Sequence, residues 1–277
     1  MSDAVGSKPR DAAARPDSPV VAFRAVSIGF ANPVLHDIGF KVAPGETRIL
    51  LGPAGVGKSV LLKLANGLLR PDSGSIQLFG EEIADMSEES LFSLRTRTGM
   101  VFQESALFDS LTVRDNVGYQ LIQERVADDQ IERRVREALS FVGLEQTFDL
   151  LPGSLSGGMR RRVAIARALI HQPELLLYDS PTGGLDPVTS TTIIELIMKQ
   201  RDVSRTPSIL VTHRLQDAFM LCTHRFDSAA GHMVPLPDGQ SDPGTTFLML
   251  DQGRLIFDGS LHELVHSEDE FVREFLE

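Results

Sequence analysis

The stretch Gly52-Pro53-Ala54-Gly55-Val56-Gly57-Lys58-Ser59 fits the P-loop pattern G-x-x-x-x-G-K-[S/T] at every fixed position, and Gly55 adds a third glycine. Before it, the apolar run at 48–51 indicates a buried strand. After it, leucines at 61, 62 and 64, with Gly67 as a stop signal, predict a helix over 59–66. Glycines let successive N–H groups point inward at phosphate oxygens. We therefore predict a nucleoside triphosphate site here.

Each polar position of this loop has a chemical use. The helix presents its N-terminus to the phosphates, Lys58 reaches the outer phosphates, and the Ser59 hydroxyl is suited to ligate Mg²⁺. We expect the nucleotide-binding residues to run from Gly52 through Val60.

The composition restricts the kind of protein and partner. A chain of 277 residues, 42% hydrophobic, can bury one large core or one core with a smaller lobe. Its net charge of −11 argues against nucleic acid as a main partner. The single cysteine, Cys222, excludes an internal disulfide and suits a reducing compartment. No apolar run approaches the roughly 18–20 residues of a membrane span.

The N-terminal part of the chain divides into a tail and two strands. Residues 1–19, rich in Ala, Asp, Ser and Pro, have no apolar signal-peptide core and indicate a disordered tail. Residues 20–26 and 34–40 alternate as strands do. Phe30 lies in the loop between them. Two readings stay open for it, core packing or stacking on a nucleotide base.

Further along, apolar runs and helical periods predict an α/β fold. Strands are expected at 75–79, 98–102, 175–179 and 208–212, and a helix at 86–94. The last two strands are continuous apolar runs separated by helices, which implies a parallel sheet covered on both faces. Gln103 follows the strand at 98–102.

Other segments complete the predicted layout. A charged, helical lobe begins at about 111, residues 227–245 lack a period and indicate a surface insertion, and 247–257 predict a hairpin turning at Gln252-Gly253. Short helices at 261–265 and 268–276 close the chain.

Four more motifs follow the P-loop in a fixed order. They are Leu155-Ser156-Gly157-Gly158-Met159, the strand 175–179 ending in Asp179, Gly184-Leu185-Asp186-Pro187, and His213 after the strand at 208–212. With them the chain resembles the ATP-binding cassette (ABC) ATPases over about residues 20–259. The resemblance implies a P-loop NTPase core with a parallel sheet, an N-terminal antiparallel β subdomain, and an inserted helical subdomain at about 111–170. Residues 260–277 are then a C-terminal helical segment.

The resemblance also implies roles for named residues. Asp179 would hold Mg²⁺ beside Ser59, and Gln103 would contact the metal or the attacking water. His213 would donate a hydrogen bond to the γ-phosphate. Ser156, Gly157 and Gly158 offer a hydroxyl and bare amides at a helix N-terminus, a second anion site that closes on the ATP of another subunit.

One P-loop and one signature per chain then imply two copies in a head-to-tail dimer. The D-loop residue Asp186 belongs to the same composite site. The arginines at 160–162 invite a nucleic-acid reading, but they follow the signature where the family also has arginines. We interpret them as structural, or as a solvated helix face.

Three segments resemble one subgroup, the Mla/Mce-type ATPases of phospholipid trafficking: Met159 in the signature, residues 101–117, and residues 268–276. This resemblance implies two integral-membrane permease subunits docked near Gln103, a periplasmic lipid-binding (Mce-type) partner, and a place on the cytoplasmic face of the inner membrane. Two alternatives stay open. One is an importer-type cassette for a polar solute, and the other is a nucleotide-gated dimerisation module with little turnover.

The chain also departs from the family at three places. Ser180 follows Asp179 where a glutamate is usual, Arg214 follows His213 where an aspartate is usual, and the insertion at 227–245 is extra. A serine hydroxyl orients water but accepts a proton poorly, so we expect slow hydrolysis. Glu104, beside Gln103, is an alternative carboxylate for the attacking water.

Overall fold

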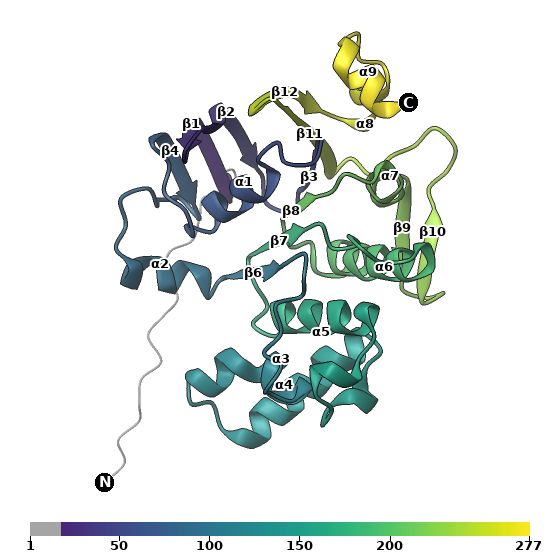
Figure 1. Cartoon of the computed structure of the whole chain (residues 1–277). Coiled ribbons are helices and arrows are strands. Elements are labelled where there is room, and N and C mark those ends of the chain that lie inside the picture. Colours follow the sequence, from purple (N-terminus) through teal and green to yellow (C-terminus); the bar gives the residue numbers. More distant parts are fainter. Residues whose placement is uncertain (1–17) are drawn as a thin grey trace.

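Two β-sheets and the helices around them make up the structure, a computed structural model that describes residues 18–277 (Figure 1). Most of the predicted tail at 1–19 therefore lies outside the described residues.

The larger sheet has six strands in the order β12–β11–β3–β8–β7–β6. The pairs from β11 to β6 are parallel, and β12 is an antiparallel edge strand. The predicted parallel sheet is confirmed, and so is the hairpin turn at Gln252-Gly253, where both residues have positive φ. The strands are β3 (Thr47–Leu51), β6 (Thr98–Val101), β7 (Leu175–Asp179), β8 (Ser208–Val211), β11 (Thr245–Asp251) and β12 (Arg254–Gly259).

The smaller sheet is antiparallel, with the order β2–β1–β4–β5. The two alternating N-terminal segments do form its strands, a little longer than predicted, and the stacked rings of Phe23 and Phe40 lie 4.7 Å apart across them. The two-residue strand β5 was missed because it consists of exposed glutamates without an apolar period. The strands are β1 (Val21–Gly29), β2 (Pro33–Val42), β4 (Ser73–Leu78) and β5 (Glu81–Glu82).

Both faces of the larger sheet are buried, which explains its continuous apolar runs. Alternate residues of one strand enter different cores: Leu50 faces one core, and Ile49 and Leu51 face the other. The Leu50 core includes the smaller sheet, α1 (Lys58–Ala65) and α2 (Glu88–Arg95). The other core includes α5 (Gly157–Leu169), α6 (Pro187–Ser204) and α7 (Leu215–Thr223). Figure 1 shows these helices arranged around the sheet.

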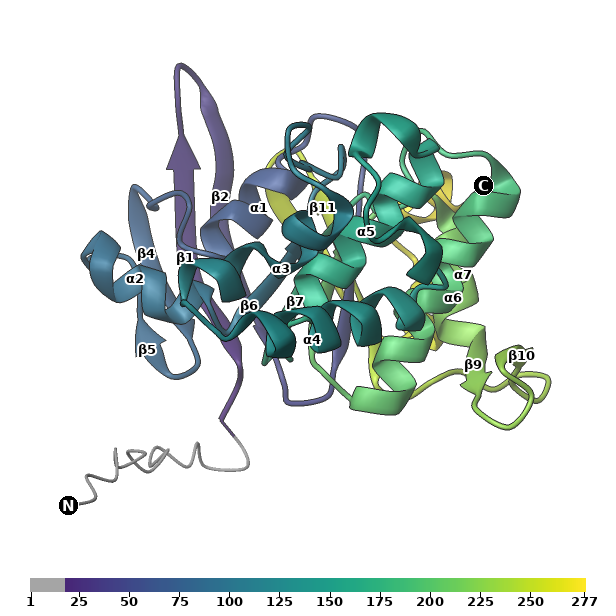
Figure 2. The same ribbon diagram turned by 90° about the horizontal axis from the view of Figure 1, so that it is seen from below.

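The helical lobe consists of α3 (Val113–Gln123), α4 (Asp128–Phe141), two short 3₁₀ turns (Glu145–Thr147 and Pro152–Ser154), and α5. Helix α4 buries Ile131, Val135 and Leu139, which lie one turn apart on a single face. In Figure 2, which shows the molecule from below, these helices lie together at the front, over the strands of the larger sheet. The predicted domain boundaries themselves stay predictions.

The insertion contains a small hairpin that the sequence pattern did not predict. Strands β9 (His224–Asp227) and β10 (His232–Pro235) pair antiparallel beside α6. The Asp227 carboxylate fixes their turn by accepting hydrogen bonds from the backbone N–H groups of Ala229 (2.9 Å) and Ala230 (3.1 Å). The strands are only four residues long and partly exposed, so they show no apolar alternation.

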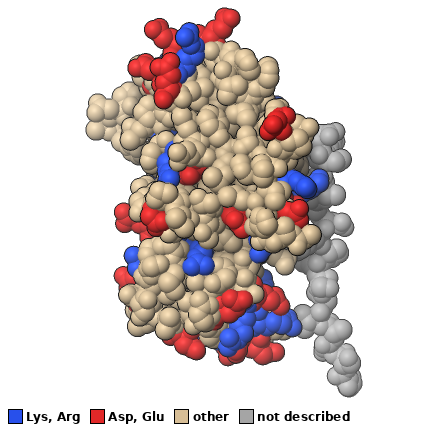
Figure 3. All heavy atoms as spheres, turned by 90° about the vertical axis from the view of Figure 1, so that its right-hand side faces the viewer, with Lys and Arg blue, Asp and Glu red and all other residues tan. Residues whose placement is uncertain are grey.

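The chain ends in α8 (Leu261–Val265) and α9 (Glu270–Leu276), close to the two predicted helices. Acidic side chains gather on this C-terminal segment, at the top of Figure 3, while the rest of that face mixes both charges. None of the helices within residues 18–277 is both long and apolar enough to cross a bilayer.

Candidate nucleotide site

The P-loop joins β3 to α1, as predicted, and its glycines are required by space. A Cβ at Gly52, which has φ 142°, would lie 2.3 Å from the Leu250 carbonyl oxygen of β11. At Gly57, with φ 109°, it would lie 2.7 Å from the Leu35 side chain of β2. The loop is thus pressed against both sheets, and larger residues would displace it.

Lys58 places a positive charge on this loop. Its side chain is buried, and Nζ donates to the carbonyl oxygens of Gly52 (2.8 Å) and Pro53 (2.5 Å). Burial lowers the pKa of Lys58, and the Asp179 carboxylate opposes that shift. A cation held at a ring of backbone amides suits the outer phosphates of a nucleotide.

Ser59 and Asp179 meet although 120 residues separate them, since the Ser59 hydroxyl donates to Asp179 Oδ1 at 2.9 Å. Burial raises the pKa of Asp179, while the Ser59 hydrogen bond and nearby cations oppose the shift. A hydroxyl and a carboxylate are hard oxygen ligands, and Mg²⁺ in nucleotide sites takes one or two carboxylates plus phosphate oxygens. This pair fits Mg²⁺. Residues 18–277 hold no group of three or more His, Cys, Asp or Glu arranged for a metal.

The remaining predicted catalytic residues follow neighbouring strand ends. Val211 of β8 pairs with Asp179 of β7 on one side and with Leu50 of β3 on the other. The loops after these three strands, including exposed His213, therefore emerge at the same edge of the sheet. Gln103 follows β6, which is adjacent to β7.

Ser180 and Gln103 converge on Gly183. A Cβ built on Gly183 would lie 3.5 Å from Ser180 Cβ and 3.7 Å from Gln103 Cγ. Ser180 has φ 46°, in the left-handed region, and is nearly buried. The position next to Asp179 thus faces the Gln103 loop and carries a hydroxyl instead of a carboxylate.

The signature lies apart from the P-loop of its own chain. Ser156 caps α5, and its hydroxyl accepts from the Met159 N–H at 3.2 Å. A Cβ on Gly158 would lie 2.3 Å from Thr189 Cγ2, so the start of α5 packs against the start of α6. Helix α5 belongs to one core and α1 to the other. One chain therefore does not bring its two anion-binding helix ends together.

The structure describes the surroundings of two further predicted nucleotide-site residues, Asp186 and Phe30, and their contacts with a nucleotide stay predictions. Asp186 caps α6 and accepts from the Thr189 N–H (3.0 Å) and hydroxyl (2.5 Å), which lowers the pKa of Asp186. Phe30 is 63% exposed in the β1–β2 loop, and this exposure excludes core packing. Base stacking by Phe30 stays a prediction.

The structure adds a buried network that the sequence patterns missed. Asp217 accepts a hydrogen bond from the Thr182 hydroxyl and lies 3.6 Å from Arg214 Nε. Arg214 Nη1 also donates to Ser190 Oγ at 2.7 Å. Burial raises the pKa of Asp217, and the Thr182 hydrogen bond opposes it. Arg214, where the family usually has an aspartate, thus joins the loop after His213 to the start of α6.

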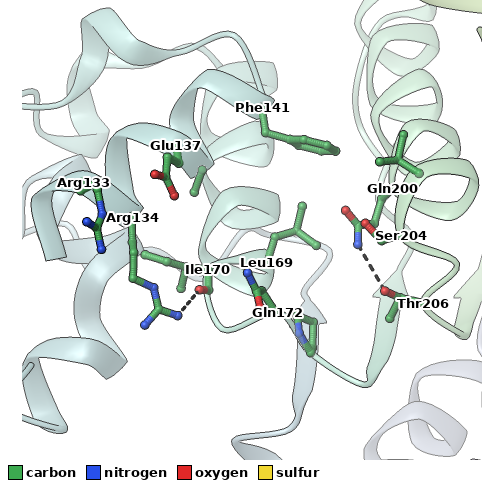
Figure 4. A pocket seen from close by; sticks show the side chains of 13 residues that line it. Arg133, Arg134, Glu137, Phe141, Leu169, Ile170, Gln172, Gln200, Ser204 and Thr206 are labelled. Atoms are coloured by element: carbon green, nitrogen blue, oxygen red, sulfur yellow. Dashed lines mark hydrogen bonds between the residues drawn. The ribbon is translucent and has the colours of Figure 1, made fainter. Parts of the chain in front are cut away.

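Several hollows lie outside the P-loop region. One of about 930 Å³ opens between α4, α5 and α6 and contains none of the predicted nucleotide residues (Figure 4). The Arg134 guanidinium at its side donates a hydrogen bond to the Ile170 carbonyl, so this cation already has a partner within the protein. Another, of about 330 Å³, includes Phe102, Phe108, Tyr119 and His171, close to Gln103. We call it the Q-loop groove.

Comparisons with known proteins agree with this geometry. A family model described as ABC transporter matches residues 35–183. Protein TRIGALACTOSYLDIACYLGLYCEROL 3, chloroplastic, of Arabidopsis thaliana is 36% identical over 255 residues, which cover 87% of this chain and 68% of that protein. "Probable ribonucleotide transport ATP-binding protein mkl" of Mycobacterium tuberculosis is 34% identical (88% and 62% covered). "Methionine import ATP-binding protein MetN 2" of Bacillus cereus is 40% identical (72% and 58% covered). The matches thus span less than two thirds of the last two relatives.

Solved structures resemble the whole described chain. The cbiO1 protein of Clostridium perfringens, part of the ABC transporter complex cbiONQ, aligns with a TM-score of 0.75 at 28% identity, covering 93% of this chain and 94% of that one. The cassette MJ0796, in a dimeric post-hydrolysis state bound to ADP and Pi, aligns with a TM-score of 0.72 at 26% identity (87% and 98% covered).

Proposed function

This chain belongs to the ABC transporter family as an ATP-binding, ATP-hydrolysing cassette, and we propose that it powers phospholipid movement across the cell envelope. The observation that carries the lipid assignment is the Arabidopsis relative. It carries the name of a galactolipid and is 36% identical over 255 residues, against 34% over 244 residues for the ribonucleotide-transport relative and 40% over 199 residues for the methionine-import relative. The segments around 101–117 and Met159, which resemble the Mla/Mce type, support the same assignment.

The working unit in this proposal is a head-to-tail dimer. Each P-loop faces the Ser156–Gly158 amides of the second copy, because within one chain the two helix ends belong to opposite sides of the sheet. Asp186, exposed next to the signature, lies where it would contact the second copy. The dimeric MJ0796 cassettes provide the precedent.

The permease docks, in this proposal, at the Q-loop groove. Phe108 and Tyr119 expose 46% and 38% of their surface there, and their ring centroids lie 4.8 Å apart. His171 Nε2 is buried and has no hydrogen-bond partner, and burial lowers the pKa of this histidine. Aromatic anchors beside an unsatisfied polar atom suit a short permease helix that supplies both an apolar side chain and a hydrogen bond. Through that permease the cassette would lie on the cytoplasmic face of the inner membrane, with an Mce-type partner beyond it.

The chain's own residues divide the chemistry. Bound Mg²⁺ would neutralise charge on the phosphate oxygens, held through Ser59 and Asp179. Lys58 binds the outer phosphates, and His213 donates a hydrogen bond as charge develops on them. Gln103 and Ser180 orient the attacking water. Ser180 accepts a proton poorly, so hydrolysis is slow and the ATP-bound dimer is long-lived.

The lipid assignment is tested by purification from native membranes. The complex should contain two permease subunits and bound phospholipid. Reconstituted between vesicles, it should move fluorescent phospholipid only when ATP is present. Recovery with a sugar- or amino-acid-binding protein, and no lipid transfer, would contradict the proposal.

Docking at the groove is tested by charge insertion. Phe108→Asp and Tyr119→Asp should abolish copurification of the permease without changing ATP affinity. Phe92→Asp is the matched control, since Phe92 on α2 is 64% exposed and lies outside the groove. Equal permease recovery from all three variants would exclude this docking site.

A second candidate, import of a polar solute, is favoured by the names of the methionine and ribonucleotide relatives. It predicts ATPase stimulation by a soluble binding protein loaded with its solute and no effect of phospholipid. Absence of turnover under every condition would instead favour a nucleotide-gated dimerisation module.

A further inference from the structure

Arg161 of α5 connects two loops of the nucleotide site with one guanidinium group. It is only 4% exposed. Nη1 donates to the Ser180 carbonyl at 3.1 Å and to the Phe102 carbonyl at 3.4 Å. Nη2 donates to the carbonyl of Gln103 and, at 3.4 Å, to that of Gly183. The same side chain thus holds the loop after β6 and the loop after β7.

Within residues 18–277, no carboxylate forms an ion pair with this guanidinium. The Asp179 and Glu104 charges only partly offset the lowering of the Arg161 pKa by burial, and Nε is buried without a partner. A guanidinium stays protonated in proteins, so this buried charge is balanced by the dipoles of its carbonyl partners and by the more distant charges of Asp179 and Glu104. Such an arrangement is a poor way to stabilise a fold. Its geometric consequence is that the two loops cannot move independently while the guanidinium lies between them.

The backbone conformation of Ser180 gives a second reason why the Arg161 hydrogen bond matters. Its left-handed conformation, with φ 46°, is sparsely populated for residues other than glycine and persists only where surrounding contacts enforce it. The Ser180 N–H donates to the Val211 carbonyl at 3.0 Å, and the Ser180 carbonyl accepts from Arg161. The Ser180 carbonyl also accepts from the Gly183 N–H at 2.9 Å, so Arg161 provides one of three hydrogen bonds that hold this residue beside Asp179.

We propose that Arg161 is a positioning residue that couples the Gln103 loop, next to the Q-loop groove, to the Ser180–Gly183 segment that faces the attacking water. Engagement of the groove would then move both loops together. This inference rests on the proposed docking of a permease at that groove. The hydrogen bonds of Arg161 all go to backbone carbonyls, so it would act through the two loops.

The neighbouring arginine offers a matched control. Arg162 lies on the same helix and its Nη1 also donates to a backbone carbonyl, that of Val142, at 3.0 Å. That carbonyl belongs to the end of α4, inside the helical lobe. Burial lowers the pKa of Arg162, as it does for Arg161. Substituting Arg162 thus removes a comparable side chain without touching either loop.

The test uses the full chain with its permease and the variants Arg161→Met, Arg161→Lys and Arg162→Met. We expect Arg161→Met to lower permease-stimulated turnover by about tenfold or more, because misplacing catalytic groups by 1 Å can cost 10²-fold. The dissociation constant for ATP should change less than about threefold, because the hydrogen bonds of Lys58, Ser59 and Asp179 do not involve Arg161. Arg161→Lys should recover only part of the lost turnover. The lysine ammonium keeps the charge and can donate to one loop, but it cannot reach both loops as the guanidinium does.

Hydrogen–deuterium exchange of the isolated cassette supplies a readout that does not depend on the partner. Arg161→Met should speed exchange at 102–106 and 180–185 together, and Arg162→Met should speed it only near 142–144. Wild-type stimulation in Arg161→Met, or faster exchange in one loop only, would overturn the proposal. If a phospholipid permease fails to stimulate the wild type, the proposed function fails, and the exchange result still decides on Arg161. If Arg161→Met does not fold, Arg161→Lys decides by the same two measurements.

Discussion

The chain contains two helix N-termini suited to anions, and they are built differently. At the start of α1, the buried Lys58 side chain and the hydrogen-bonded Ser59–Asp179 pair lie next to the backbone amides. At α5 the amides of Gly157 and Gly158 have only the capping Ser156 hydroxyl beside them. In the proposed function, the first end holds a nucleotide and Mg²⁺. The second end recognises a nucleotide that another subunit already holds.

This difference implies that some residues should determine ATP affinity and others should determine only the rate of ATP turnover. Substitutions at α1 should affect ATP affinity even in a single chain. Substitutions at α5 should leave that affinity intact and affect only what requires two chains.

The largest effect is expected at Lys58. Lys58→Ala should weaken ATP binding about 100-fold, since a hydrogen bond to a charged group is worth up to about 3 kcal/mol and each 1.4 kcal/mol is tenfold. Calorimetry of the isolated cassette measures it. Lys41→Ala, exposed on β2, is the control and should bind normally. Equal affinity in the two variants would contradict the assignment.

At α5 we expect a smaller effect of another kind. A Cβ on Gly157 meets only Leu185 Cδ2 at 3.6 Å, so Gly157→Ala fits the fold. The added methyl group would face the second subunit and should lower turnover about tenfold, as expected for disturbing one contact to the transferring phosphoryl group. ATP affinity and Tm should not change. The control is Gly153→Ala, whose Cβ would meet nothing. Weakened ATP binding by the isolated Gly157→Ala chain would erase the distinction between the two helix ends.

Ser180→Glu sharpens the comparison by adding the missing carboxylate to the α1 side. General-base help is worth about 10²–10⁴ in rate, but positioning and charge dominate phosphoryl transfer, so we expect turnover to rise at least several-fold. Phosphate release at saturating ATP, with the permease present, measures it. If turnover does not rise, another group, such as Glu104, already serves as the base.

The smallest effect concerns stability and pH. Burial raises the pKa of Asp179, so the folded protein binds this proton more tightly than the unfolded chain, and the wild type gains stability as the pH falls through the raised value. At pH 7 Asp179→Asn should therefore raise Tm by about 2 °C or less. The gain should shrink at lower pH, as thermal scans across pH would show.

Asp186→Asn should behave in the opposite way. The Thr189 hydrogen bonds lower the pKa of Asp186, so its contribution is present at neutral pH and is lost as the pH falls. Asp186→Asn should lower Tm at pH 7 and have less effect in acid. Identical pH trends for the two variants would show that burial does not control Asp179.

Much of the fold and site was predictable because local patterns carry it. The apolar runs at β7 and β8 predicted buried parallel strands, and Asp179 and His213 could be placed at strand ends by counting residues. The helix predicted at 86–94 is α2, and the hydroxyl of Ser87 caps it. These features depend on neighbours in sequence.

The rest depends on contacts between distant residues. Nothing in the run 160–162 distinguishes Arg161, which is buried between two loops, from Arg160, which donates to the signature residue Leu155. The Asp217–Thr182 hydrogen bond joins residues 35 positions apart. The β9–β10 hairpin is held by a turn and by packing on α6, and neither leaves a period in the sequence.

The place of β3 in its sheet has a consequence for biosynthesis. Both strands that flank it, β8 and β11, are encoded far downstream, and Thr47 pairs with Thr245. While the ribosome is still translating residue 200, the P-loop has been made but its strand has no neighbours. Because such long-range pairing is slow and leaves apolar surface exposed, we expect the nascent chain to need protection from aggregation until nearly the whole sequence has emerged. Truncation between His213 and the start of β11 should therefore remove nucleotide binding altogether, although every motif residue would be present.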